Sequence, residues 1–218
     1  MSTTGANLQT SLAYRLGETS APSDNTTKNI RYVWLTEGYF DLARRRNWFW
    51  QEATNTSNTN TGSTTGYAEP SDLKEFRELE INGVFYDQIP YTDRRIYTNT
   101  LGVVSLPSLR RSYKYYRYGG RYYLIPTDGN DAATHTIKYY KRVSVIDDDA
   151  DTILIPDEYR EALVAYAEGK YWMSITQQAK AVAPFQEYEQ IVAQLEQEHN
   201  RRGVGSSGWT IHDPEDAY

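Results

Sequence analysis

Apolar residues recur at helical spacing near the start of the chain. Leu8, Leu12 and Leu16 lie four residues apart and Gly17 follows them. Side chains at this spacing share one face of a helix, and glycine tolerates the backbone conformation that ends one. The pattern therefore predicts a short amphipathic helix that ends at Gly17.

A longer helix is predicted between a cap at Thr26 or Thr27 and the basic run at residues 44–46. The cations of this run suit the negative end of the helix dipole. The apolar stripe of the helix consists of Ile30, Val33, Trp34, Leu35 and Leu42. The aromatic run at residues 48–50 directly follows and is expected to turn the chain out of the helical body.

The last third of the chain predicts two more helices. Pro156 precedes Asp157 and Glu158, an order that favours a helix N-terminus, and helical spacing then continues to about residue 178. A second helix is expected to reach residue 201 or 202, with a break near Pro184 and an end at Gly203. Only a short segment follows.

Between these helices the pattern changes to period two, which is typical of strands. Runs at residues 76–81 and 84–89 flank Asn82-Gly83 and predict a hairpin. A second hairpin is predicted at 113–125 around Gly119-Gly120, and a further strand at 135–145. Residues 54–66 contain only Thr, Asn, Ser and Gly. Because no side chain there drives burial, we predict a mobile loop.

These elements predict an α+β fold, namely an antiparallel helical bundle that carries an inserted β unit. Residues 1–50 and 153–202 are assigned to the helical domain, and residues 51–152 to the insertion. The insertion is expected to be a small antiparallel unit of hairpins, similar to a β-sandwich. Residues 203–218 are expected to form an extended C-terminal tail.

Composition narrows the class of function. The 218 residues carry a net charge of −6, which does not favour a general nucleic-acid binder. Cysteine is absent, so cysteine-based catalysis, disulfides and thiolate metal sites are excluded. No apolar run approaches the length of a membrane span, and we expect a soluble, unprocessed chain with no membrane partner. The 20 tyrosines favour interfaces and half-buried strands, so assembly is the first hypothesis.

Little in the sequence indicates catalysis or a cofactor. Only three histidines are present and no G-x-S-x-G motif accompanies them, so we expect no enzyme and no cofactor. The acidic segment at 147–158 is the one alternative, because Asp147, Asp149, Asp151 and Glu158 take positions 1, 3, 5 and 12 of a calcium loop. Thr152 replaces the glycine that the loop requires. We therefore expect a solvated connector without metal ligands, with a cation site as the alternative.

The basic, tyrosine-rich segment at residues 94–121 has the most specific pattern. It contains seven Lys or Arg residues and no acidic residue. One interpretation is a nucleic-acid-binding module in which phosphates meet the cations and bases stack on tyrosines. A second is docking on an acidic protein surface, and a third is a hairpin with cations on its solvated face. The sequence leaves these three open.

Several motifs together resemble the head-to-tail adaptor proteins of tailed bacteriophages, also called connector or head completion proteins. The motifs are DLARRRNWFW at 41–50, YLIP at 123–126, IKYYK at 137–141 and ILIPDEYREAL at 153–163. The resemblance covers residues 27–202, and the Thr/Asn segment at 54–66 departs from it. A hydrolase with an unrecognised site remains a distant third possibility beside the nucleic-acid-binding module.

The resemblance implies a structural virion protein, made in the cytoplasm of the bacterial host and located in the neck of the virion. It implies a ring, usually dodecameric, between the portal protein and a tail or nozzle protein, with DNA passing transiently through the lumen. The ring wall would carry the aromatic residues Trp34, Trp48, Trp50, Tyr166 and Trp172. The tail would bind the portal through Val204, Trp209, Ile211 and Tyr218. Docking on tail components or the next subunit would use Arg110, Arg111, Tyr113, Lys114, Tyr116, Arg117, Tyr118 and Arg121.

Overall fold

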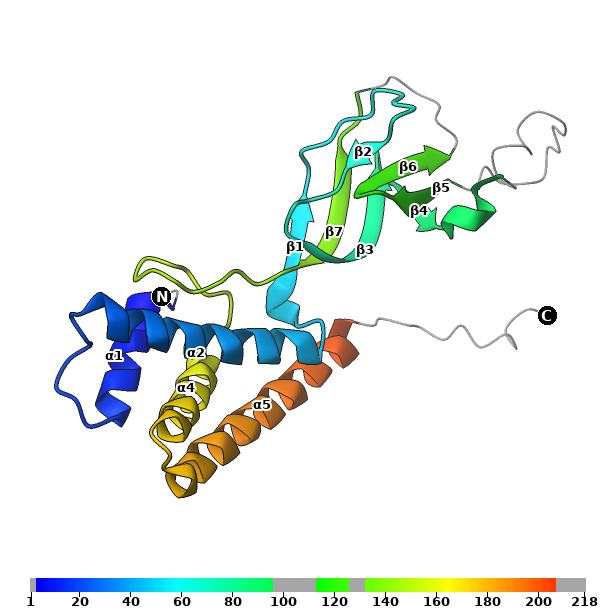
Figure 1. Cartoon of the computed structure of the whole chain (residues 1–218). Coiled ribbons are helices and arrows are strands. Elements are labelled where there is room, and N and C mark those ends of the chain that lie inside the picture. The colour runs from blue at the N-terminus through cyan, green and yellow to red at the C-terminus, as the bar shows by residue number, and fades with distance from the viewer. Residues whose placement is uncertain (1–2, 96–112, 126–131, 207–218) are drawn as a thin grey trace, which may run out of the picture. The chain divides into compact units, whose positions relative to one another are not determined.

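The computed structural model describes residues 3–95, 113–125 and 132–206 and divides into two compact units (Figure 1). The helical unit consists of Met1–Trp50 and Val143–Tyr218, and the β unit of Gln51–Arg142. The predicted mixture of helices and strands is confirmed. The chain joins the helical unit again at Val143 rather than at residue 153, because Ile146 and Ile153 are already buried in the helical core.

Helix α1 spans Gly5–Arg15 and agrees with the predicted short helix. Thr4 caps it by accepting a hydrogen bond from the backbone N–H of Asn7. Leu8 and Leu12 are fully buried. The chain then turns at Gly17, whose φ of 80° lies in the region that favours glycine.

Helix α2 spans Asn25–Arg45 and differs from the prediction in its cap and its buried face. The cap is Asp24, whose Oδ1 accepts from the backbone N–H of Thr27 at 2.7 Å, and not Thr26 or Thr27. Ile30 and Val33 are 46% and 55% exposed, so their predicted place in the core is wrong. The large apolar and aromatic residues that α2 buries most deeply are Tyr32, Leu35, Tyr39 and Leu42. The prediction missed the centre of the buried face because the tyrosines on it were not counted as apolar residues.

Helix α4 (Arg160–Ser174) follows a 3₁₀ turn at Asp157–Tyr159 and packs between α2 and α5 (Gln178–Ser206). A glycine allows α2 to approach α4 closely, and a second glycine allows α4 to approach α5. A Cβ atom on Gly38 of α2 would lie 2.9 Å from the Tyr166 ring, and one on Gly169 would lie 2.8 Å from the Phe185 ring. Larger residues at either glycine would force the helices apart.

The predicted helix boundaries near the C-terminus are wrong in two places. The break falls after α4, where Thr176 has a φ of 61°, and Pro184 instead lies inside a continuous α5. Helix α5 also extends past Gly203 to Ser206. Pro184 is buried on the face that packs inward, and tertiary contacts there outweigh the local cost of proline in a helix.

The β unit contains one seven-stranded sheet that curls (Figure 1). Its strands are β1 (Glu52–Asn55), β2 (Tyr67–Ala68), β3 (Leu73–Ile81), β4 (Val84–Gln88), β5 (Lys114–Tyr118), β6 (Arg121–Ile125) and β7 (His135–Lys141). Their order in the sheet is β1-β7-β3-β4-β5-β6-β2. A 3₁₀ turn at Tyr91–Asp93 follows β4. Strand β7 ends at Lys141 rather than at residue 145, because Val143 packs against the helical core.

Both predicted hairpins are confirmed. Strands β3 and β4 pair through Ile81 and Val84, and the turn residues Asn82 and Gly83 have φ values of 52° and 76°. Strands β5 and β6 pair on either side of Gly119-Gly120. The expectation of a purely antiparallel unit is wrong, since β4 and β5 run parallel where the hairpins join. This pairing joins the two hairpins into one sheet.

The Thr/Asn segment contains more structure than its composition suggests. Thr54 and Asn55 belong to β1, and Thr59 forms an isolated bridge with Thr134. Asn60 is only 4% exposed, although the composition of the segment predicted a mobile loop in which no side chain drives burial. Its amide compensates for burial by accepting a hydrogen bond from the Tyr67 hydroxyl at 3.0 Å.

Candidate interaction site

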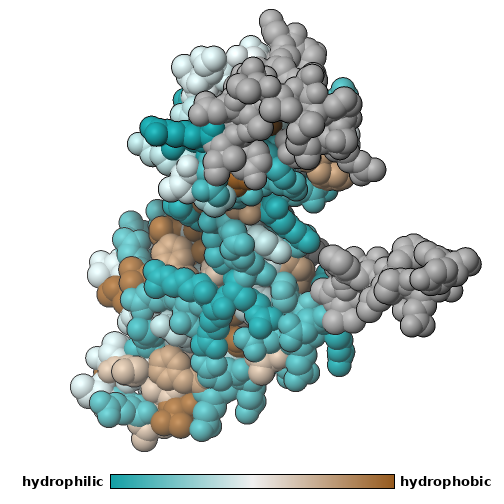
Figure 2. Space-filling view, turned by 90° about the vertical axis from the view of Figure 1, so that its right-hand side faces the viewer, coloured by the Kyte–Doolittle hydropathy of each residue, from teal (hydrophilic) through white to brown (hydrophobic). Residues whose placement is uncertain are grey.

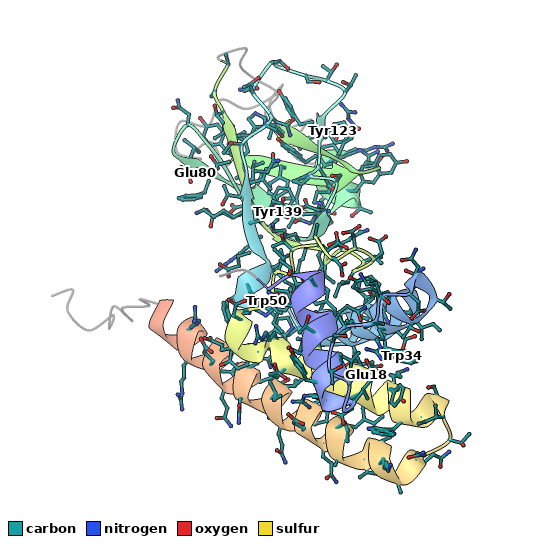
Figure 3. The ribbon with its side chains drawn as sticks, turned by 90° about the vertical axis from the view of Figure 1, so that its left-hand side faces the viewer. Glu18, Trp34, Trp50, Glu80, Tyr123 and Tyr139 are labelled. Atoms are coloured by element: carbon teal, nitrogen blue, oxygen red, sulfur yellow. The ribbon has the colours of Figure 1, made fainter. Side chains whose placement is uncertain are left out.

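Tyrosines alternate between the two faces of the β5–β6 hairpin. Tyr115 and Tyr122 point into the core and are 2% and 0% exposed. Burial raises the pKa of Tyr115 to about 12, so its hydroxyl stays protonated at neutral pH. Tyr116 and Tyr123 pair across the strands on the other face, with ring centroids 4.9 Å apart and planes 3° from parallel (Figure 3).

The 3₁₀ turn after β4 extends this second face. The ring of Tyr91 stacks on Tyr118 at 4.5 Å, and the guanidinium of Arg94 lies 3.6 Å from the Tyr91 centroid. Tyr118 remains 58% exposed. We call the five residues that form this surface the tyrosine face: Tyr91, Arg94, Tyr116, Tyr118 and Tyr123. Their rings support one another, so the surface is organised before any partner arrives.

Three further cations of the basic segment, all on the β5–β6 hairpin, have partners within the protein. Lys114 pairs with Asp87 at 2.6 Å, and Arg121 donates to the backbone oxygen of Gly66 at 2.7 Å. Arg117 binds both carboxylate oxygens of Glu69, at 2.6 and 2.9 Å, and this hydrogen bonding raises the pKa of Arg117. Acids from β4 and the β2–β3 loop neutralise Lys114 and Arg117, and a backbone oxygen binds Arg121, so these three cations do not form a continuous cationic surface.

A buried network of hydroxyl, amide and imidazole groups supports the same unit from inside. The Tyr122 hydroxyl lies 2.6 Å from Nδ1 of His135 and accepts a hydrogen bond from the side-chain amide of Asn58 at 3.1 Å. The Tyr67 hydroxyl accepts from the backbone N–H groups of Thr61 and Ser63 at 3.1 and 3.2 Å. These contacts hold the Thr/Asn segment at residues 54–66 against the sheet.

The five predicted ring-wall aromatics have different environments. Trp48 is fully buried and donates from Nε1 to the Leu42 oxygen at 2.7 Å, so it belongs to the core of its own chain. Trp50 stacks on Tyr39 at 6.0 Å. Trp34, Tyr166 and Trp172 are half-buried between the helices. None of these five is highly exposed.

Arg110 and Arg111 of the predicted docking set lie outside the described residues, as do Trp209, Ile211 and Tyr218 of the predicted portal-binding tail. Val204 lies in the last turn of α5. The predicted residues that the fold does bring together are Tyr116 and Tyr118. Tyr91 and Tyr123 of the tyrosine face were not singled out, because stacking between separate elements leaves no local sequence signal.

The acidic segment at 147–158 uses its carboxylates for local hydrogen bonds. Asp151 accepts from the backbone N–H groups of Asp147 and Asp148 at 2.9 Å, and these bonds lower the pKa of Asp151. Asp149 pairs with Lys28 at 2.7 Å. Within the described ranges, no cluster of three His, Cys, Asp or Glu side chains is placed to hold a metal ion. The segment acts as a connector braced against α2.

The fold thus defines a two-unit protein whose described surface carries stacked aromatic side chains and exposed apolar ones. In the part of the chain that the structure describes, no helix has both the length and the apolar character needed to cross a bilayer. Residues 3–209 match the SU10 adaptor protein family, and the chain belongs to that family. It is therefore a structural adaptor protein of bacteriophages, a class that associates with portal and tail in the virion neck. Comparison with curated proteins gave no match.

Proposed function

We propose that copies of this chain form a ring between the portal and the tail of a bacteriophage, complete the neck and surround the channel through which DNA passes. The observation that carries this proposal is the family match, which extends over both the helical and the β unit. The helical unit would form the ring wall, because exposed faces of α2 and α5 are available for contact with neighbouring copies.

The C-terminal segment would bind the portal. Residues 207–218 follow the end of α5 and contain two large apolar residues, Trp209 and Ile211, beside three acidic side chains and no basic one. Such a segment has little to bury on its own and gains from insertion into an apolar partner surface. We therefore infer that Trp209 and Ile211 are its anchors.

The tyrosine face would dock on a tail component. Tyrosine provides a large contact area with little loss of side-chain entropy, and Tyr118 leaves most of its ring accessible. A protein partner is favoured over nucleic acid, because Lys114, Arg117 and Arg121 already have partners within the chain.

Removal of residues 207–218 tests the portal contact. We expect the shortened chain to keep its circular dichroism spectrum and melting temperature, since the cut falls after the last turn of α5. It should fail to co-purify with the portal protein encoded by the same genome, whereas the full chain should co-purify. Normal portal binding by the shortened chain would refute the assignment.

Substitution of Tyr118 by Ala tests the tail contact. The variant should bind the portal normally yet leave particles without tails, because only the tyrosine face is changed. Tyr14→Ala is the matched control, since Tyr14 of α1 is 63% exposed and lies in the helical unit. Equal yields of tailed particles from both variants would remove the tyrosine face from the proposal.

A further inference from the structure

Four large apolar side chains are exposed where α2 begins and α4 ends. Ile30 and Val33 of α2 are 46% and 55% exposed, and Met173 and Ile175 are 50% and 41% exposed. Trp34, which is labelled in Figure 3, packs edge to face on Tyr171 with ring centroids 6.2 Å apart, beside these residues. Single exposed apolar residues are ordinary on protein surfaces, but a group of them indicates an interaction surface.

Helix packing places these four residues at the same end of the α2–α4 pair. Trp34 of α2 contacts Tyr171 of α4, and Glu37 of α2 pairs with Lys170 of α4 at 2.7 Å. A later residue of α2 thus contacts an earlier residue of α4, so the two helices run antiparallel. Val33 is one turn before Glu37, and Met173 is one turn after Lys170. Both therefore lie beyond the ion pair on the same side. We call Ile30, Val33, Met173 and Ile175 the apolar edge.

A second uncharged surface lies on α5. Its exposed residues recur at helical spacing on the side away from the core, and we call them the α5 outer face: Val182, Ala183, Gln186, Gln190, Ala193, Gln194 and Gln197. A solvated helix face normally carries charges, and their absence is a mark of interface cores. Glu189 borders this face, but both its oxygens are bound to Arg45 at 2.6 and 2.7 Å.

The two surfaces share the absence of unpaired charge in the residues that define them. The apolar edge presents branched and long side chains, whereas the α5 outer face contains a shallow groove lined by Val182, Phe185, Gln186, Glu189 and Gln190. Figure 2 shows apolar side chains gathered at the end of the helical unit where α4 and α5 meet. Neither surface contains an unpaired charge among the residues that define it, so contact between the two surfaces would not remove an unpaired charge from water.

We propose that the apolar edge of one copy packs on the α5 outer face of a second copy. Helix α4 lies between α2 and α5, so the two surfaces are on different sides of one chain and the contact is head to tail. Head-to-tail contacts join copies in series and close into a ring when the rotation allows it. This inference rests on the proposed ring and assigns the surfaces that form it.

Cysteine cross-linking tests this contact, since the chain contains no cysteine of its own. Val33→Cys and Gln190→Cys proteins are mixed and oxidised, both as purified protein and within assembled particles. The mixture should give a disulfide-linked heterodimer, and the double variant should give a ladder of larger species. Cross-linking should exceed by about tenfold that of a Val145→Cys and Gln190→Cys mixture, because docking raises the effective concentration of the thiols. Val145 is a matched control, 52% exposed on the helical unit.

Each other outcome overturns the proposal. Cross-linking no stronger than the Val145→Cys control would show that the two surfaces do not meet. Dimers of Val33→Cys alone that exceed the mixed product would show that the apolar edge pairs with itself. Particles that contain a ring but lack the cross-link would refute this contact while leaving the adaptor function intact. Particles that lack the chain would instead refute the proposed function.

Discussion

The helical unit and the β unit place the polar groups of their tyrosines differently. In the helical unit the buried rings of Tyr32 and Tyr188 reach carboxylates at the rim, Asp149 and Asp41. In the β unit Tyr139 also reaches a carboxylate, Asp72, but the hydroxyls of Tyr67 and Tyr122 meet amide and imidazole groups inside the unit. The helical unit thus has a mainly apolar core with carboxylates at its rim, whereas the β unit also contains an internal network of hydroxyl, amide and imidazole groups.

The largest expected effect is a cavity in the helical core. Leu163 of α4 is fully buried, and Leu163→Ala should lower the free energy of unfolding by about 2–5 kcal/mol. Chemical denaturation followed by tryptophan fluorescence measures this, because every described tryptophan lies in the helical unit. Val33→Ala, at a 55% exposed position, is the control and should change stability little. Similar losses from both variants would contradict the assigned core.

A smaller effect is expected from the network of the β unit. Tyr122→Phe removes the hydroxyl that joins Asn58 to His135 and should cost about 1–3 kcal/mol, because buried polar groups lose a partner. Backbone amide hydrogens of Thr61 and Ser63 should exchange faster with solvent, because the Thr/Asn segment that contains them is held less firmly against the sheet. Tyr123→Phe on the opposite face is the control. Unchanged exchange in Tyr122→Phe would show that the segment does not depend on the network.

The smallest effect is acid destabilisation of the helical rim. The Arg15 guanidinium holds the pKa of Glu187 below its usual value, and Lys28, then Tyr32, do the same for Asp149. Their stabilisation is present above the ordinary carboxyl pKa values and is lost as pH falls through the lowered ones. Both groups are well exposed, so each should contribute less than about 1 kcal/mol between pH 5 and 3.

Melting temperatures recorded across this pH range, at low and high salt, check the third prediction. Glu187→Gln should flatten part of the pH dependence, and added salt should weaken the rest. Stability that rises as pH falls would contradict the assigned ion pairs.

Local signals were enough to predict the hairpins and the positions of most helices. Asn82-Gly83 and Gly119-Gly120 define their turns by backbone conformation alone. The parallel pairing of β4 with β5 could not be predicted, because it joins segments that are distant in sequence. The burial of Asn60 also depends on a partner outside its run, Tyr67, so composition alone suggested a mobile loop.

The site was less predictable than the fold. Exposed Ile30 and Val33 have the same spacing as buried residues of α2, and only packing against α4 distinguishes them. The basic segment lacked acidic residues in sequence, yet Asp87 and Glu69 supply them in space. Interaction surfaces are thus defined by which elements meet, which a one-dimensional pattern does not record.

Electron cryomicroscopy of the neck in purified virions tests the central claim most directly. The adaptor account predicts a closed ring of this chain between portal and tail, with the helical units side by side. A neck that lacks this chain, or that holds isolated copies without mutual contact, would contradict the account.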